Sequence, residues 1–223
     1  MIRAVIFDMD GVLTDSESLG VPITCEVARE MGFEVAESVV LKTLGITWSA
    51  SVGIYEEVYP GLDVREMFDR VREKLINLGE EGKMPLMPGV HRILELLDKL
   101  GIPKAVASSN GPKAIQAYLS GAGIYDRFDR VICGNECKRS KPEPDVFLLA
   151  AEKLGVPPED CLVIEDSPSG VRAGRAAGMT VCMIPDLAPF DEELRPYCDW
   201  VFKSLDELAN RWTDVAGKGD AHG

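Results

Sequence analysis

Short runs of β-branched residues, each followed by acidic or small polar residues, alternate along this chain with stretches of helical periodicity. The expected strands cover residues 4–7, 104–107, 130–133, 162–164, 180–184 and 200–202. The helices expected between them cover residues 90–100, 113–122, 145–154 and 170–177. Because continuous apolar runs are typical of strands covered on both faces, this alternation predicts a doubly wound parallel sheet, a Rossmann-like α/β core.

Residues 15–84 interrupt this alternation. Helical patterns at 22–31 and 64–78 follow one another with no strand between them, and a proline-rich joint at 83–89 leads back to the α/β pattern. At roughly 150 residues per domain, a chain of 223 residues is expected to form one domain with an insertion. We therefore expect a discontinuous core (1–14 and 85–212), a helical cap domain (15–84) and a flexible tail (213–223).

Charge and composition narrow the range of partners. The chain has 37 acidic against 24 basic residues, a formal net charge of −13, which argues against nucleic acid and membrane surfaces as partners. No apolar run approaches the ~20 residues that span a bilayer, and Asp8 comes too early for a signal peptide. The six cysteines are widely spread and form no zinc pattern. We expect a cytoplasmic protein and, by default, a monomer.

Polar side chains follow the expected strands at the ends where open parallel sheets bind their ligands. These residues, together with one lysine from a later loop, are Asp8, Asp10, Ser108, Ser109, Lys141, Glu165 and Asp166. Carboxylates from two strands suit Mg2+, while hydroxyl, backbone N–H and ammonium groups can hold phosphoryl oxygens. One carboxylate can act as a nucleophile and form an aspartyl-phosphate, and another as a general acid and base. The pattern indicates phosphoryl-transfer chemistry.

Four motifs carry a resemblance to a known family. They read Phe7-Asp8-Met9-Asp10-Gly11-Val12-Leu13-Thr14-Asp15, Val106-Ala107-Ser108-Ser109-Asn110, Lys141-Pro142-Glu143-Pro144-Asp145 and Val163-Ile164-Glu165-Asp166-Ser167. In order and spacing the chain resembles the haloacid dehalogenase-like hydrolase superfamily over residues 2–208. Within it, the chain is similar to the β-phosphoglucomutase-like sugar phosphatases, which carry an inserted helical cap.

The resemblance implies roles for individual residues. Asp8 would be the nucleophile and a Mg2+ ligand, and Asp10 the general acid and base, with its backbone carbonyl on the metal. The phosphoryl group would be held by Ser108, the Ser109 backbone and Lys141. Asp166 would complete the metal site, together with Glu165 acting directly or through water. The cap would close over the substrate, and its residues Gly45, Ile46, Thr47 and Trp48 would contribute to selectivity.

The function expected from these roles is a Mg2+-dependent phosphatase that hydrolyses a small phosphorylated metabolite, a sugar or polyol phosphate, through an aspartyl-phosphate. The alternative is a phosphosugar mutase of the β-phosphoglucomutase type. Similar mutases carry a cap histidine where this chain has Gly20, and their cap arginine is missing from Ile46-Thr47-Trp48-Ser49. Asp10 and the Glu165-Asp166 pair argue against a haloacid dehalogenase. A binding protein with a degenerate site would be expected to lack one of these acids.

Overall fold

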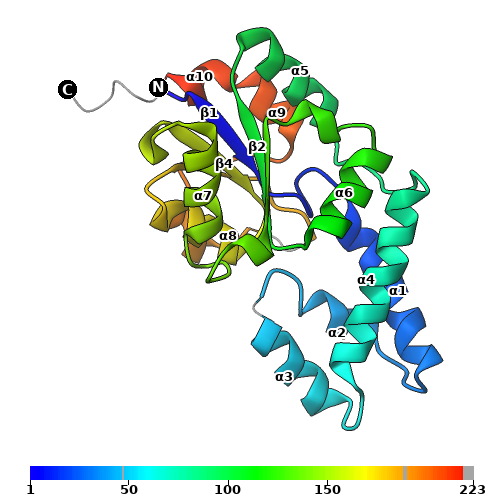
Figure 1. Ribbon diagram of the computed structural model, residues 1–223. Coiled ribbons are helices and arrows are strands. Elements are labelled where there is room, and N and C mark those ends of the chain that lie inside the picture. Colours follow the sequence, from blue (N-terminus) through cyan, green and yellow to red (C-terminus); the bar gives the residue numbers. More distant parts are fainter. Residues whose placement is uncertain (47, 188–189, 218–223) are drawn as a thin grey trace.

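The computed structural model describes residues 1–46, 48–187 and 190–217, and its centre is a six-stranded parallel sheet. The strands are β1 (Ala4–Phe7), β2 (Lys104–Ser108), β3 (Arg130–Cys133), β4 (Cys161–Glu165), β5 (Thr180–Met183) and β6 (Trp200–Val201). Their order across the sheet is β3-β2-β1-β4-β5-β6 (Figure 1). This order confirms the doubly wound α/β fold and places β1 and β4 side by side at the centre.

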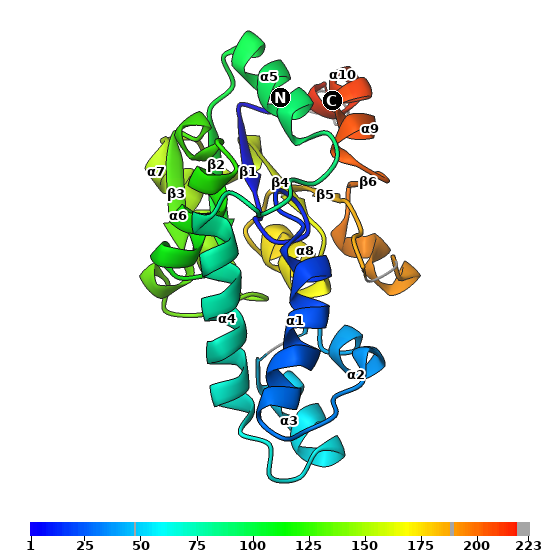
Figure 2. The same cartoon turned by 90° about the vertical axis from the view of Figure 1, so that its right-hand side faces the viewer.

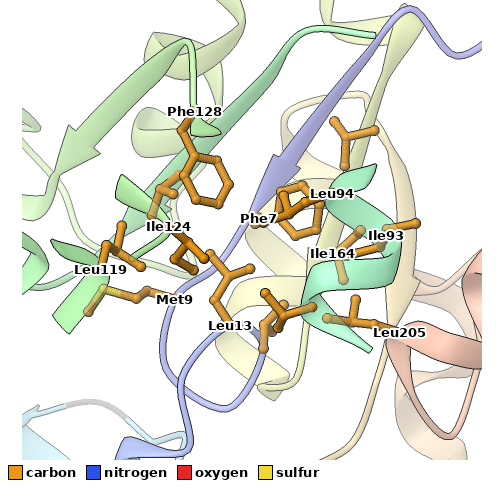
Figure 3. Packing of buried hydrophobic residues seen from close by; sticks show 14 of the residues in the cluster. Phe7, Met9, Leu13, Ile93, Leu94, Leu119, Ile124, Phe128, Ile164 and Leu205 are labelled. Carbon is orange, nitrogen blue, oxygen red and sulfur yellow. The ribbon is translucent and has the colours of Figure 1, made fainter. Parts of the chain in front are cut away.

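Helices cover both faces of the sheet. One face packs against α5 (Val90–Leu100), α6 (Pro112–Gly121), α9 (Leu205–Asn210) and α10 (Trp212–Ala216), and the other against α7 (Asp145–Leu154) and α8 (Pro168–Ala176). Each face has its own hydrophobic cluster, and successive side chains of β1 point to the two faces in turn. Val5 and Phe7 belong to the first cluster, and Ala4 and Ile6 to the second. Figure 3 shows the first cluster around Phe7. Both faces of β1 are therefore buried, as its continuous apolar sequence predicts.

Four helices follow β1 and form a separate layer beyond the sheet (Figure 2). They are α1 (Ser16–Glu30), α2 (Glu37–Leu41), α3 (Trp48–Val58) and α4 (Val64–Glu80). These helices share a hydrophobic cluster of their own, in which the side chains of Tyr55 and Met67 are fully buried. We refer to residues 15–84 as the cap. The cap helices therefore pack around a hydrophobic core of their own.

The two chain segments that join the cap to the sheet are paired with each other. Thr14 and Leu86 form an antiparallel bridge. The N–H of Asp15 donates to the Pro85 carbonyl at 3.0 Å, and that of Met87 to the Leu13 carbonyl, also at 3.0 Å. The cap therefore leaves and re-enters the core through a short two-stranded connection. Its last helix, α4, also packs against α6 of the core.

Most expected boundaries lie within two residues of the observed ones, and two differ by more. Helix α1 begins at Ser16 rather than at 22 and contains Pro22, because Val21 and Val27 are buried in the cap cluster, and this packing outweighs the missing backbone donor. The expected tail from 213 is wrong in its first residues, since α10 continues to Ala216 and buries Val215. Residues 218–223 lie outside the described part of the chain. Short 3₁₀ turns at Tyr125–Arg127, Gly134–Glu136, Pro158–Asp160 and Glu192–Tyr197 complete the connections.

Among the helices of the described residues, none has the length and apolar character needed to cross a membrane.

Candidate active site

A buried ion pair joins the residue after β1 to the loop before α7. Lys141 Nζ lies 2.5 Å from Asp8 Oδ1 and 2.7 Å from Glu165 Oε1, and it sits 4.8 Å from the centre of the Phe147 ring. The side chains of Asp8, Lys141 and Glu165 are at most 10% exposed. Strands β1 and β4 are neighbours, so their carboxyl ends bring Asp8 and Glu165 together. This is the edge at which open parallel sheets bind their ligands.

Glu165 has a hydrogen-bond donor on both carboxylate oxygens. Its Oε1 accepts from Lys141, while its Oε2 accepts from the backbone N–H of Asp166 at 3.0 Å. The N–H and the hydroxyl of Ser167 also donate to Oε2, each at 2.9 Å. This carboxylate therefore fixes the position of the lysine and of the loop after β4.

Three buried carboxylates form a group that could hold a metal ion. Within the described residues, Asp8, Glu165 and Asp166 each offer one oxygen, and these oxygens lie within 4.8 Å of one another. Gly11 allows the close approach of Asp166: it has a φ of 70°, and a Cβ there would lie 2.5 Å from Asp166 Oδ2. A set of hard carboxylate oxygens in a small space fits Mg2+ better than a soft transition metal.

The charges of this group are not balanced by the protein alone. Burial raises the pKa of Asp8 and of Asp166, and the neighbouring Glu165 raises both further. Burial lowers the pKa of Lys141, but the negative charges of Asp8 and Glu165 outweigh this effect and hold its pKa above the usual range. One ammonium thus faces three carboxylates, and a bound cation would relieve the excess negative charge.

Both carboxylate oxygens of Asp10 accept hydrogen bonds. Ser16 donates its hydroxyl to Oδ1 at 2.5 Å, and Asn110 donates its side-chain amide to Oδ2 at 2.6 Å. Burial raises the pKa of Asp10, whereas the Ser16 hydrogen bond lowers it. A carboxyl group with a raised pKa beside a cavity is suited to general acid and base catalysis.

A cavity of about 440 Å³ lies between the cap and the core. Its core wall includes Asp10, Ser109, Asn110 and Tyr118. Its cap wall includes Ser16, Glu17, Gly20, Phe68 and Arg72, together with the expected selectivity residues Gly45, Ile46 and Trp48. Thr47, the fourth expected selectivity residue, lies outside the described residues. The volume falls within the usual range for small-molecule sites.

The two serines at the end of β2 have different surroundings. Ser108 is fully buried, and its hydroxyl oxygen accepts from the Asn110 backbone N–H at 3.1 Å. Ser109 is exposed and lines the cavity. The structure thus brings the expected residues Asp8, Lys141, Glu165 and Asp166 into one cluster, and Asp10 and Ser109 onto the cavity next to the cap.

Several polar residues that line the cavity were not predicted as site residues, among them Ser16, Glu17, Asn110 and Arg72. Ser16 and Glu17 follow the first motif and Asn110 is the last residue of the second, so their position in the chain was an available signal. Arg72 is an exposed residue of a cap helix with an ion pair to Asp69 at 2.6 Å, and nothing in its local sequence distinguishes it.

Substituting Gly170 should damage the site. A Cβ at this position would lie 1.7 Å from Glu165 Oε1, so we expect Gly170→Ala to displace Glu165 and with it Lys141. Catalytic activity should fall by about 10²-fold, the scale of one lost electrostatic contact in a transition state. The matched control is Gly53→Ala in α3, where a Cβ would have no neighbour within 4 Å. It should stabilise the protein by about 0.5–1 kcal/mol. Equal activity of the two variants would contradict this account.

Glu17 should make stability depend on pH. Burial, followed by the charge of Asp10, raises its pKa from 4.5 to about 7. An acid with a raised folded-state pKa stabilises the fold below its unfolded pKa, and this contribution is lost as pH rises from 4.5 through about 7. In chelator, Glu17→Gln should therefore raise the melting temperature at pH 8 relative to wild type, by about 2–4 °C per kcal/mol, but not at pH 4.5. Glu56→Gln, on the exposed cap surface, is the control; identical curves for both variants would refute the effect.

Comparisons with known proteins show which family this chain belongs to. The sequence model of the family "Haloacid dehalogenase-like hydrolase" matches residues 5–184. Hexitol phosphatase B of Escherichia coli (strain K12) is 33% identical over 210 residues, covering 93% of this chain and 94% of that protein. A phosphorylated carbohydrates phosphatase of Thermotoga maritima is 34% identical and covers 80% of this chain and 82% of its own. The crystal structure of a putative β-phosphoglucomutase from Thermotoga maritima superposes with a TM-score of 0.78 at 29% identity, over 96% of this chain and 100% of the other.

Proposed function

The chain belongs to the haloacid dehalogenase-like hydrolase family, and from this premise we propose that it is a Mg2+-dependent phosphatase of sugar or polyol phosphates. Its general class is phosphoric monoester hydrolase, as for the named phosphatases that it resembles. The observation that carries the finer proposal is the buried Asp8 carboxylate, held by Lys141 next to Glu165 and Asp166. In this arrangement Lys141 neutralises the charge of Asp8 from one side, and a metal ion could approach the carboxylate from the other. The arrangement therefore supports a nucleophilic role for Asp8.

Asp8 and Asp166 would hold Mg2+, together with the backbone carbonyl of Asp10. Glu165 would act through a water molecule, because both of its oxygens already accept hydrogen bonds. When bound, the ion supplies positive charge that stabilises the negative phosphoryl oxygens.

The residues of the chain then account for both chemical steps. A carboxylate oxygen of Asp8 attacks phosphorus and forms the aspartyl-phosphate as the bond to the leaving oxygen breaks, while Asp10 gives that oxygen a proton. Asp10 next takes a proton from a water molecule. That water attacks phosphorus, breaks the aspartyl-phosphate bond and releases inorganic phosphate. Lys141, Ser108 and the Ser109 backbone hold the phosphoryl oxygens throughout.

The charges of the cavity favour an uncharged leaving group. Asp10 and Glu17 both line it, and the ion pair of Arg72 with Asp69 offsets the charge of that arginine. A second phosphate or a carboxylate on the substrate would therefore face repulsion from Glu17 once that acid is ionised, whereas Asp10 carries the proton that it gives to the leaving oxygen. A neutral polyol or sugar meets no such penalty, and it can donate hydroxyl hydrogen bonds to Glu17.

A phosphosugar mutase is the second candidate, because similar structures include β-phosphoglucomutases. Gly20 lines the cavity where similar mutases carry a histidine, so no imidazole faces the substrate there. We therefore favour hydrolysis, in which water replaces the returning substrate.

A substrate panel tests the proposal. Purified protein with Mg2+ should release phosphate from hexitol and hexose monophosphates, should turn over bisphosphates more slowly, and should lose activity in excess chelator. Full activity in chelator would refute the metal role. Isomerisation of β-glucose 1-phosphate without net phosphate release, in the presence of a bisphosphate primer, would favour the mutase.

A further inference from the structure

Asn110 follows Ser108, the last residue of β2, and Ser109, and both its backbone N–H and its carbonyl are hydrogen-bonded. Its N–H donates to the Ser108 hydroxyl oxygen at 3.1 Å, and its carbonyl accepts from the Gly134 N–H, also at 3.1 Å. Neither bond uses the side chain. The side-chain amide is thus presented from a fixed position and remains available for another partner.

That partner is Asp10, 100 residues away in the sequence, at 2.6 Å. The amide nitrogen of Asn110 is a donor and cannot accept a proton, so it favours an unprotonated Oδ2. The hydroxyl of Ser16, at 2.5 Å from Oδ1, can either donate or accept. A proton on Asp10 is therefore compatible with Oδ1 and disfavoured on Oδ2.

We propose that Asn110 is a positioning residue for Asp10: its amide orients the carboxyl group and confines the transferable proton to Oδ1, beside the leaving-group cavity. This inference rests on the proposed role of Asp10 as general acid and base. Asp10, Ser16 and Asn110 all line the same cavity. A proton on Oδ1 would therefore lie close to the leaving oxygen of a substrate bound there. Asn110 acts through Asp10, and its removal should affect only steps that need this proton.

Two substrates separate this role from a general structural one. A hexitol 6-phosphate has an alkoxide leaving group that needs a proton, whereas para-nitrophenyl phosphate releases a stable phenolate that does not. With Asn110→Ala, kcat for the hexitol phosphate should fall at least about tenfold, part of the 10²–10⁴-fold that a general acid contributes. KM should change little. The rapid first burst of para-nitrophenol, which reports aspartyl-phosphate formation, should stay within threefold of wild type.

Asn110→Asp provides a second variant of the same shape, which removes the donor and adds a negative charge next to Asp10. We expect kcat for the hexitol phosphate to fall further than in Asn110→Ala, while the para-nitrophenol burst again stays close to that of the wild type. The matched control is Gln116→Ala, which removes an exposed amide from α6 and should leave both substrates unaffected. Equal losses on both substrates, or no loss on either, would overturn the proposal.

A double-mutant cycle tests whether Asn110 acts through Asp10. If it does, adding Asn110→Ala to Asp10→Asn should cause no further loss of kcat on the hexitol phosphate. Independent, additive losses would overturn the role of Asn110 while leaving that of Asp10 intact. Normal kcat for Asp10→Asn alone would instead refute the proposed function, so the two failures are distinguishable.

Discussion

Asp8→Asn should abolish phosphate release, with a loss in kcat of about 10⁴-fold or more, the scale seen when a catalytic nucleophile is removed. The amide keeps the shape of the carboxyl group, but it is a poor nucleophile and cannot form a stable phosphoryl ester. It also leaves Lys141 with Glu165 as its remaining close carboxylate partner. The measurement is phosphate release from a hexitol phosphate at saturating Mg2+, with mass spectrometry of the quenched enzyme to detect the aspartyl-phosphate.

Asp160→Asn is the control for this substitution. Asp160 is a surface acid whose ion pair with Arg3 spans 3.2 Å, and exposed pairs of this kind contribute little. Its activity should remain within twofold of wild type. Substantial turnover by Asp8→Asn, or a phosphorylated residue other than Asp8 in the wild type, would contradict the mechanism.

Lys141→Met should destabilise the protein as well as inactivate it. The substitution leaves two buried carboxylates without their cation, and breaking a buried ion pair in this way costs about 3–5 kcal/mol. For a chain of this size the melting temperature should fall by about 2–4 °C for each kcal/mol. Thermal unfolding in chelator measures this loss without interference from bound metal.

The double variant Lys141→Met/Glu165→Gln is the matched comparison. It removes one of the two unpaired charges, so it should recover part of the lost stability without recovering activity. If Lys141→Met had the same melting temperature as the wild type, the buried ion pair would contribute nothing to the stability of the fold. One that retains full activity would show that Lys141 does not hold the phosphoryl group.

The sheet and the residues after its central strands could be predicted from sequence for one physical reason. Continuous apolar strands imply a sheet covered on both faces, and parallel strands present all their carboxyl ends at one edge. Asp8 directly follows β1 and Glu165 is the last residue of β4, so their proximity can be predicted without knowing side-chain conformations. The lysine was identified from its motif, and its contact with both acids became visible only in the structure.

The remaining features depend on packing between distant parts of the chain. Nothing near Asn110 in the sequence indicates that its amide reaches Asp10, because that contact depends on how the loops after β1 and β2 approach each other. The need for glycine at 170 arises from the position of the Glu165 carboxylate, which is likewise set by the fold. Helix α10 was not predicted because it has only five residues, and Trp212 and Val215 hold it against the core through packing that its local sequence does not reveal.

The position of β1 in the sheet has a consequence for how the chain folds during synthesis. Strand β1 pairs with two strands that are made much later, since Val5 aligns with Lys104 on one side and Leu162 on the other. The cap has local contacts and can form early, whereas the centre of the sheet must wait for the second half of the chain. A nascent or truncated chain that ends before β4 therefore exposes an unpaired apolar edge and lacks Glu165 and Asp166.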